Sequence, residues 1–181
     1  RPFRSRRHRA HVLRQPYRIA RGELAAALGV TPEDLPAVVG RIRGSLTQRL
    51  PVSPESVAAI RALYEQQAPG VLAATVESAD RICGHVFDLL GSGPVPLGKT
   101  IDWHRDFKSG YRWNPEQCFL DVPHGHEVGV DIKVPWELSR GHHLVLLAQT
   151  ALLSGDEKYA RECLAQMTGW IDANPTAHGV N

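Results

Sequence analysis

Apolar residues recur at helical spacing from residue 54 to residue 90, which predicts two successive helices. In the first, "PESVAAIRALYEQQ", the apolar face consists of Val57, Ile60, Leu63 and Tyr64. Ser53 is a suitable N-cap for this helix, and Pro69 with Gly70 ends it. In the second, "GVLAATVESADRICGHVFDLL", the apolar positions in register are Leu72, Val76, Ala79 and Cys83.

The same spacing returns towards the end of the chain. Between residues 136 and 153 the apolar side consists of Leu144, Leu147, Ala148, Ala151 and Leu152. In residues 156–174 it consists of Tyr159, Cys163, Leu164, Met167, Trp170 and Ile171. Gly155 ends the first of these helices, Asp156 is a suitable N-cap for the second, and Asn174 with Pro175 stops it. Two helices joined by so short a turn predict an antiparallel hairpin.

Residues 91–134 lie between these helical regions and show no helical period, but they are rich in Gly, Pro and aromatic residues. Long irregular segments inside compact domains are often functional. Before the first helical region, residues 22–50 indicate short helical pieces, with Thr31 as an N-cap and Pro32 at a first helical position. The pattern as a whole predicts an all-α fold of helix hairpins, interrupted by one long irregular segment.

Charge is distributed unevenly along the 181 residues, whose net charge is +2. Residues 1–21 hold eight arginines and no acid, whereas the other 160 residues hold 13 basic and 19 acidic side chains. A basic arm of this kind can be a solvated tail, a targeting peptide or a binder of nucleic acid or anionic lipid. We predict no nucleic-acid partner, and no apolar run approaches the length of a membrane span.

Cysteines and histidines give no metal signature. The cysteines are Cys83, Cys118 and Cys163, which form neither a disulfide framework nor a zinc pattern. The paired histidines are His124 with His126 and His142 with His143, and their spacing matches no standard zinc motif. We therefore predict no bound metal. A general base could come from His104, His124 or His142, and the sequence selects none of them.

An aromatic and basic cluster opens the irregular segment. Its members are Trp103, His104, Arg105, Phe107, Lys108, Tyr111, Arg112 and Trp113. Aromatic faces stack on the C–H faces of sugar rings, and Arg and Lys donate hydrogen bonds to carboxylates or sulfates. This combination suits an anionic sugar polymer. The alternative is a loop that packs its aromatics into the core and leaves its basic groups in water.

The phrase "DIKVPWELSR" places several polar groups at the start of an apolar helix. If Pro135 begins the helix, Trp136 and Arg140 share a face, and Glu137 is close enough to pair with Arg140. One interpretation is a structural clamp formed by Glu137 and Arg140. The other is a helix end that lines a cleft, with Lys133 and Arg140 facing an anionic ligand.

The chain resembles the heparinase II/III family of polysaccharide lyases in four phrases, which occur in the order expected for that family. They are "IDWHRDFKSGYRW", "DIKVPWELSRGHH", "LLSGDEKYA" and "WIDANPTAHGVN". The resemblance covers roughly residues 55–181. It implies an N-terminal (α/α) toroid of antiparallel hairpins, followed by a C-terminal β-sandwich. We therefore expect residues 1–50 to be a basic arm with short helices, and residues 51–181 to be the first part of the toroid in a fragment of a longer protein.

The resemblance implies β-elimination on a uronic-acid polysaccharide without a cofactor. A base removes the proton next to the uronate carboxylate, donors stabilise the developing charge, and an acid, usually a tyrosine, protonates the leaving oxygen. The family's Asn–His pair, tyrosine and second histidine are expected beyond Asn181, so we predict no catalytic residue here and no turnover by this chain alone. The residues expected to bind substrate are Trp103, His104, Trp113, Lys133, Trp136, Arg140 and Asn181. The pair Glu137–Arg140 is expected to be chiefly structural.

The rival hypothesis is a non-catalytic helical-hairpin module that binds a glycan or a protein, because "LLSGDEKYARECL" resembles the turn of a tetratricopeptide hairpin. The predicted partners of the lyase reading are an acidic polysaccharide and the remaining toroid and β-sandwich portions of the same chain. The sequence leaves the polymer open among heparan sulfate, alginate, other uronans and a cell's own exopolysaccharide. The family favours a periplasmic or secreted location, and the sequence leaves a cytoplasmic one open.

Overall fold

The computed structural model describes residues 22, 25–26, 28–47, 54–124 and 127–181, so the arginine-rich segment 1–21, Ser53 and His126 lie outside the described residues. The helices are α3 (Leu35–Thr47), α4 (Val57–Gln67), α5 (Pro69–Cys83), α6 (Lys133–Ser139), α7 (His142–Ser154) and α8 (Glu157–Ala173). Short 3₁₀ turns lie at Pro54–Ser56 and Phe119–Asp121. The mainly helical class is confirmed, while closure into a toroid stays a prediction.

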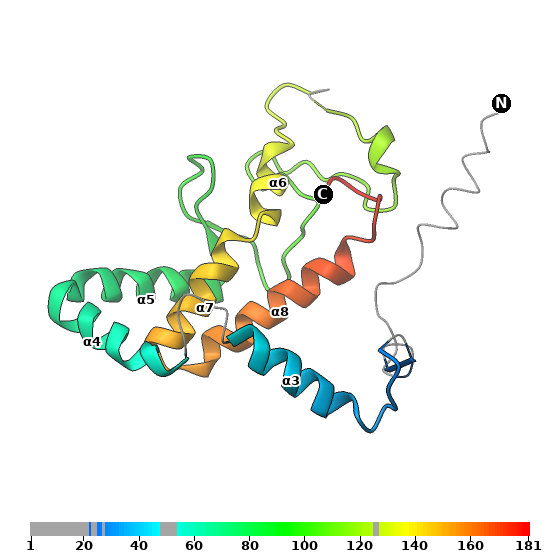
Figure 1. The fold of residues 1–181 in the computed structure, drawn as a ribbon. Coiled ribbons are helices and arrows are strands. Elements are labelled where there is room, and N and C mark those ends of the chain that lie inside the picture. Colours follow the sequence, from blue (N-terminus) through cyan, green and yellow to red (C-terminus); the bar gives the residue numbers. More distant parts are fainter. Residues whose placement is uncertain (1–21, 23–24, 27, 48–53, 125–126) are drawn as a thin grey trace.

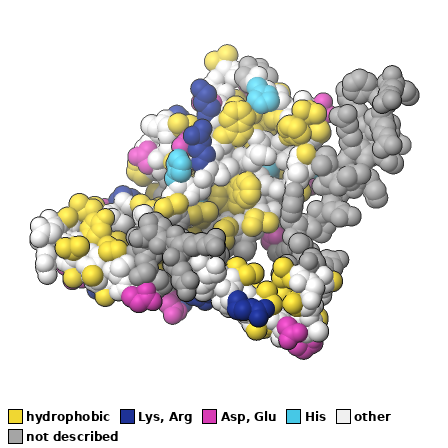
Figure 2. Space-filling view, in the orientation of Figure 1, with side chains coloured by type: hydrophobic (Ala, Val, Ile, Leu, Met, Phe, Trp, Pro, Cys, Tyr) yellow, Lys and Arg dark blue, Asp and Glu magenta, His cyan; other side chains and the backbone are white. Residues whose placement is uncertain are grey.

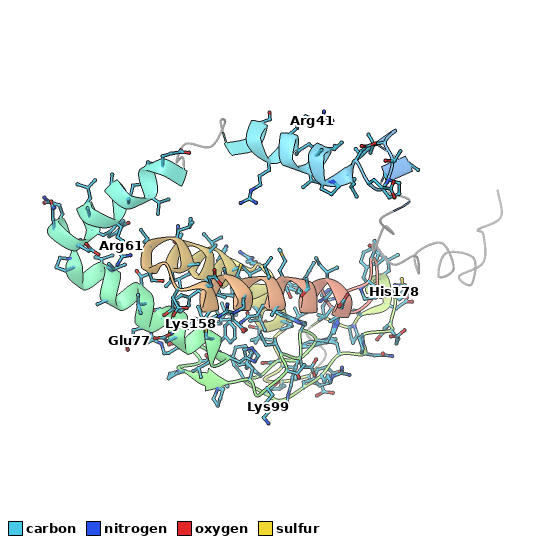
Figure 3. The ribbon with its side chains drawn as sticks, turned by 90° about the horizontal axis from the view of Figure 1, so that it is seen from below. Arg41, Arg61, Glu77, Lys99, Lys158 and His178 are labelled. Carbon is cyan, nitrogen blue, oxygen red and sulfur yellow. The ribbon has the colours of Figure 1, made fainter. Side chains whose placement is uncertain are left out.

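Helices α4, α5, α7 and α8 gather on one side of the molecule, and the irregular segment covers the other side (Figure 1). Helix α3 stands apart from α7 and α8 in the view of Figure 3, where Arg41 and Lys99 lie on opposite sides of those helices. The hydroxyl of Thr31 accepts a hydrogen bond from the backbone N–H of Asp34, so Thr31 caps the turn that leads into α3. Within the described part of the chain, no helix is long and apolar enough to cross a bilayer.

The helix expected over residues 70–90 is shorter than its apolar pattern. Helix α5 ends at Cys83, and the next residues leave the helix because His85 adopts a φ of +52°. Strand β1 (Val86–Phe87) then pairs antiparallel with β2 (Val95–Pro96). The apolar run after Gly84 is therefore not helical. Its Phe87 is buried in a cluster with Ile101, Trp103 and Leu138, which come together only in the folded chain.

A second correction concerns the helix expected over residues 136–153, which is two helices. Helix α6 starts at Lys133 and ends at Ser139, and α7 starts at His142. Gly141 lies between them with a φ of +70°, a conformation that L-residues rarely adopt, so the chain turns there. The break gives α6 an orientation of its own at the head of α7 (Figure 1).

The hairpin of α7 and α8 is confirmed, including its turn. Gly155 adopts a φ of +75° at the end of α7, and the Asp156 carboxylate accepts a hydrogen bond from the backbone N–H of Lys158 at 2.9 Å. Asn174 ends α8, and its amide donates to the carbonyl of Trp170 at 2.8 Å. The predicted apolar face of α8 is only partly covered, because Leu164, Met167 and Ile171 are exposed.

Helix α5 is held to α7 and α8 by an apolar cluster and a polar tie. The buried members of the cluster are Ala79, Leu147 and Tyr159, with Cys83 and Cys163 packed against them as partly buried free thiols. At its edge the Tyr159 hydroxyl donates to the Asp80 carboxylate at 2.9 Å, and the Lys158 ammonium lies 2.9 Å from the same oxygen. Hydrogen bonds from Lys158 and Tyr159 lower the pKa of Asp80, so this carboxylate stays charged.

Candidate functional site

Helix α6 presents a basic and aromatic face to solvent. Lys133, Trp136 and Arg140 are spaced three and four residues apart, so their side chains emerge on one side of the helix. All three are exposed, Trp136 to 39%. Figure 2 shows Lys, Arg and His side chains gathered beside large hydrophobic ones over α6. We call Lys133, Trp136 and Arg140 the α6 face.

Glu137 lies beside the α6 face and orients its basic end. One carboxylate oxygen of Glu137 is 3.2 Å from Nε of Arg140, and the other is 3.9 Å from Nδ1 of His142. The Arg140 side chain remains 62% exposed, so this ion pair contributes less than about 1 kcal/mol to stability. Its main effect is to restrict the position of a guanidinium that stays accessible to a ligand.

The orientation of the Trp136 side chain is fixed by Val180 and His124. Its indole N–H donates to the carbonyl of Val180 at 2.6 Å, and its ring centroid lies 5.8 Å from that of His124. The exposed aromatic surface is therefore held in one orientation. A pre-positioned aromatic face binds with little loss of side-chain entropy.

Residues 178–181, which end the last of the four sequence phrases, contact residues of the first two phrases, around Trp103 and Trp136. His104, 2% exposed, accepts the N–H of Val180 at Nδ1 and faces the carbonyl of Ala173 at Nε2, 3.0 Å away. This pair of partners requires one ring acceptor and one ring donor, which is the neutral Nε2–H tautomer. The buried His104 ring therefore links the end of α8 to Val180 through two hydrogen bonds.

We call residues 178–181 and the side chains that contact them the joint, and Asn181 extends it through its amide. Its N–H₂ group donates to the carbonyl of Trp103 at 2.7 Å and to the side-chain oxygen of Asn174 at 2.9 Å. The side-chain oxygen of Asn181 is buried and has no hydrogen-bond partner among the described residues. Such an acceptor favours a donor from outside the described structure.

The other two tryptophans of the predicted site are core residues. Trp103 is 5% exposed and packs with Phe87, Ile101 and Leu138. Trp113 is 1% exposed, packs with Val180, and donates its indole N–H to the carbonyl of Pro123 at 3.2 Å. The structure thus gathers Trp103, His104, Trp113, Trp136 and Asn181 around residues 178–181. Lys133 and Arg140 lie further out, on α6.

Sequence reasoning missed Asp106, which organises the irregular segment. Its fully buried carboxylate accepts the Ser109 hydroxyl at 2.6 Å and the backbone N–H groups of Lys108, Ser109 and Asp131 at 2.9 to 3.3 Å. Burial by itself raises the pKa of Asp106, but these hydrogen bonds outweigh it and lower the pKa. The bond from Asp131 fixes the entry to α6. The available signal was the local phrase "DFKSG", in which an acid precedes a serine and a glycine in a tight turn.

A groove of about 480 Å³ lies beside this joint, between residues 100–104 and the end of α8. Its charged lining is Asp102, Arg112, Glu116 and Asp172. Arg112 is already paired with Asp102 at 2.6 Å. Acids outnumber bases here, so electrostatic attraction of a polyanion favours the α6 face over this groove. Across the described ranges, no three His, Cys, Asp or Glu side chains gather as metal ligands would.

The comparisons with known proteins bear on the same region of the chain. A family model described as Heparinase II/III N-terminus matches residues 55–181. No curated protein and no solved structure matches the chain. The matched range contains the α6 face, Asp106 and the whole joint around residues 178–181.

Proposed function

Since this chain belongs to the Heparinase II/III N-terminus family, we propose that it is part of a polysaccharide lyase that cleaves a uronic-acid-containing polymer by β-elimination. The family supports the polysaccharide lyase class, and the α6 face supports an acidic polymer. In this reaction a base takes the proton next to the uronate carboxylate, and an acid protonates the leaving glycosidic oxygen. We assign neither role to a residue of this chain.

The observation that carries the proposal is the α6 face itself. Lys133 precedes Trp136 and Arg140 follows it on the same side of α6, so both offer charged donors on the face that carries the ring, and none of the three is buried. A sugar ring stacked on Trp136 would bring its carboxylate, or that of its neighbour, within reach of one of these cations. Arg140, restrained by Glu137, suits bidentate contact with a carboxylate.

The remaining residues of the predicted site fall into two groups. Trp103, His104 and Trp113 are buried, and we propose that they position the α6 face and the end of the chain without touching sugar. Asn181 is half-buried, follows the residue that accepts the Trp136 hydrogen bond, and carries a side-chain oxygen without a partner among the described residues, so we place it at the edge of the glycan site.

Binding to immobilised heparan sulfate and alginate, with neutral dextran as the reference polymer, tests the proposal. The double variant Lys133→Ala/Arg140→Ala should weaken binding of the acidic polymers by at least about tenfold, because each charged hydrogen bond contributes about 1.5 kcal/mol or more. Arg41→Ala/Arg43→Ala removes the same charge from α3 and is the matched control. Equal losses in the two double variants would indicate non-specific attraction and contradict the α6 face as the site.

Two substitutions of Trp136 distinguish sugar stacking on its ring from the hydrogen bond that holds the ring to Val180. Trp136→Phe keeps an aromatic face but loses the hydrogen bond to Val180, whereas Trp136→Ala loses both. We expect Phe to retain most of the binding and Ala to reduce it to the level of the double variant. Equal binding by Ala and Phe would exclude stacking on this ring.

An activity assay distinguishes the lyase hypothesis from that of a non-catalytic binding module. We expect glycan binding without formation of unsaturated uronate, which is measured by its ultraviolet absorbance. Measurable turnover would overturn our view that no residue of this chain is catalytic. If the protein carrying the rest of the toroid also bound glycan without turnover, the non-catalytic binding module would be the better description.

A further inference from the structure

His85 occupies a strained position where α5 meets the β-hairpin. Its φ is +52°, which non-glycine residues rarely adopt unless surrounding contacts impose it. Its backbone carbonyl accepts the N–H of Leu97, so the residue is also part of the hairpin's hydrogen bonding. The side chain is only 18% exposed.

Both ring nitrogens of His85 face acceptors. Nδ1 lies 2.8 Å from the carbonyl oxygen of Gly98, and Nε2 lies 3.0 Å from a carboxylate oxygen of Glu162 on α8. The side-chain amide of Gln166 donates to the same Glu162 oxygen at 2.7 Å and holds it in place. A carbonyl and an ionised carboxylate cannot donate, and a neutral imidazole has only one N–H. The two contacts together therefore need the doubly protonated imidazolium.

His104 provides the contrast within the same molecule. Its Nδ1 accepts an N–H and its Nε2 faces a carbonyl, so the neutral ring satisfies both partners. His85 has no such neutral solution unless Glu162 itself takes up the proton. One histidine site therefore suits the neutral ring, and the other needs an additional proton on His85 or Glu162.

We propose that protonated His85 is a pH-sensitive latch that fastens the loop from Leu97 to Ile101 onto α8. A cavity of about 390 Å³ lies across this seam, with Lys99 and Thr100 on the loop side and Glu162 and Gln166 on the α8 side. Loss of the proton removes one of the two ring contacts. The loop is then held to α8 less tightly, and the cavity becomes more accessible.

The charged and titratable neighbours are few among the described residues. Glu162 faces the ring from α8, and Lys99 lines the same cavity from the loop. Cys83 comes from the end of α5, where burial first, and then the charge of Glu162, raise its thiol pKa, so it stays neutral. Asp80, also from α5, is paired with Lys158.

The sign of the pH effect follows from the contacts. The two ring contacts can exist together only while the imidazole carries both protons, so the latch is closed when the ring is protonated. The latch opens when a rise in pH removes one of these protons. An acid-released latch would behave in the opposite way.

Nitrogen NMR of the histidine side chains tests the protonation state directly. Two-bond ¹H–¹⁵N spectra of the intact chain at pH 6 should show both His85 nitrogens protonated and His104 as the neutral Nε2–H tautomer. A neutral His85 ring at pH 6 would overturn the proposal, because the proton would then reside on Glu162. His104 serves as the internal reference.

Amide hydrogen exchange tests the release. After correction for intrinsic rates, protection of Leu97 to Ile101 should fall on the order of tenfold between pH 6 and pH 8.5, the expected effect of losing a charged hydrogen bond. His85→Gln should show the low protection at both pH values. Glu162→Gln should remove the pH dependence, because its amide can donate to the neutral ring. His142→Gln, which replaces an exposed histidine on α7, is the matched control. Protection that does not depend on pH in the unmutated protein would contradict the proposal.

Discussion

The imidazole of His104 lies directly over the α-carbon of Gly179, so a Cβ atom at position 179 would stand 2.3 Å from Cε1 of the ring. Gly179 also adopts a φ of +72°. Two independent constraints therefore require glycine at this position. It is the residue that lets the end of the chain pass close enough to His104 for the next N–H to reach the ring.

Gly179→Ala should lower the free energy of unfolding by about 2–6 kcal/mol. The left-handed backbone and the overlap with a buried ring each cost about 1–3 kcal/mol. Gly93→Ala is the matched control, because Gly93 has a φ of +67° but nothing within 4 Å of its Cβ position. Urea unfolding of both variants isolates the overlap, and equal losses would show that the contact with His104 costs nothing.

Asp106→Asn should destabilise the protein by about 1–3 kcal/mol, because the new amide faces N–H donors that the carboxylate had satisfied. It should also weaken acidic-glycan binding, since the N–H of Asp131 that it holds leads directly into α6. Asp88→Asn, at an exposed position, is the control for charge alone. Unchanged binding in Asp106→Asn would mean that α6 is positioned without this hydrogen bond.

Because the pKa of Asp106 is lowered in the folded protein, the free energy of unfolding should decrease at acidic pH. A carboxylate whose folded pKa is lowered stabilises the protein above its ordinary pKa of 3.8, and the contribution is lost as pH falls through the lowered value. Unfolding at a series of pH values from 6 to 2 should therefore show a steeper loss near and below pH 3.8 in the unmutated protein than in Asp106→Asn. Parallel curves would contradict this assignment.

His143 should act in the opposite direction to His85. Burial, partly offset by Gln166, lowers the pKa of His143 from 6.5 to about 4. The unfolded chain then takes up a proton between these values and the folded protein does not, so stability falls by up to about 3 kcal/mol as pH drops from 6.5 to 4. His143→Phe keeps the ring contacts with Phe87 and Trp103 and should flatten this slope. An equally steep slope in that variant would rule His143 out as its source.

Tyr159→Phe tests the tie between α5 and α8. Removing the hydroxyl that donates to Asp80 should cost about 0.5–1.5 kcal/mol in thermal or urea unfolding, because Asp80 keeps its contact with Lys158. Tyr64→Phe on α4 removes a hydroxyl from an exposed residue and should be neutral. A similar loss in both variants would show that the hydrogen bond to Asp80 is not the cause.

The elements that sequence predicted well are those whose signals are local. The turn at Gly155 and Asp156, the end of α8 at Asn174 and the irregular texture of residues 91–134 follow from residues within a few positions of each other. The break at Gly141 was missed although its signal was also local, because the apolar period continues on both sides of it. The end of α5 was missed because Phe87 fits a helical period and a buried strand equally well.

The candidate site divides in the same way. The spacing of Trp136, Glu137 and Arg140 fixed their common helix, and the structure contains the Glu137–Arg140 ion pair. No local pattern could show that Trp103 and Trp113 are buried while Trp136 is exposed. That difference depends on residues 178–181, which meet all three only in the folded chain. The local turn around Asp106 had a signal in the sequence, but its contact with the entry to α6 had none, because Asp131 lies 25 residues away.

The joint around residues 178–181 also sets the order in which this protein can fold. Its hydrogen bonds link residues 44, 76 and 78 positions apart, whereas the helices close over four. Contacts of such long separation form late, after the loop-closure entropy has been overcome. During synthesis, helices α4 and α5 can pack against each other early. The hydrogen bond that orients Trp136 can form only after Val180 has left the ribosome. The surface assigned to glycan therefore takes its final form only after the helices that surround it.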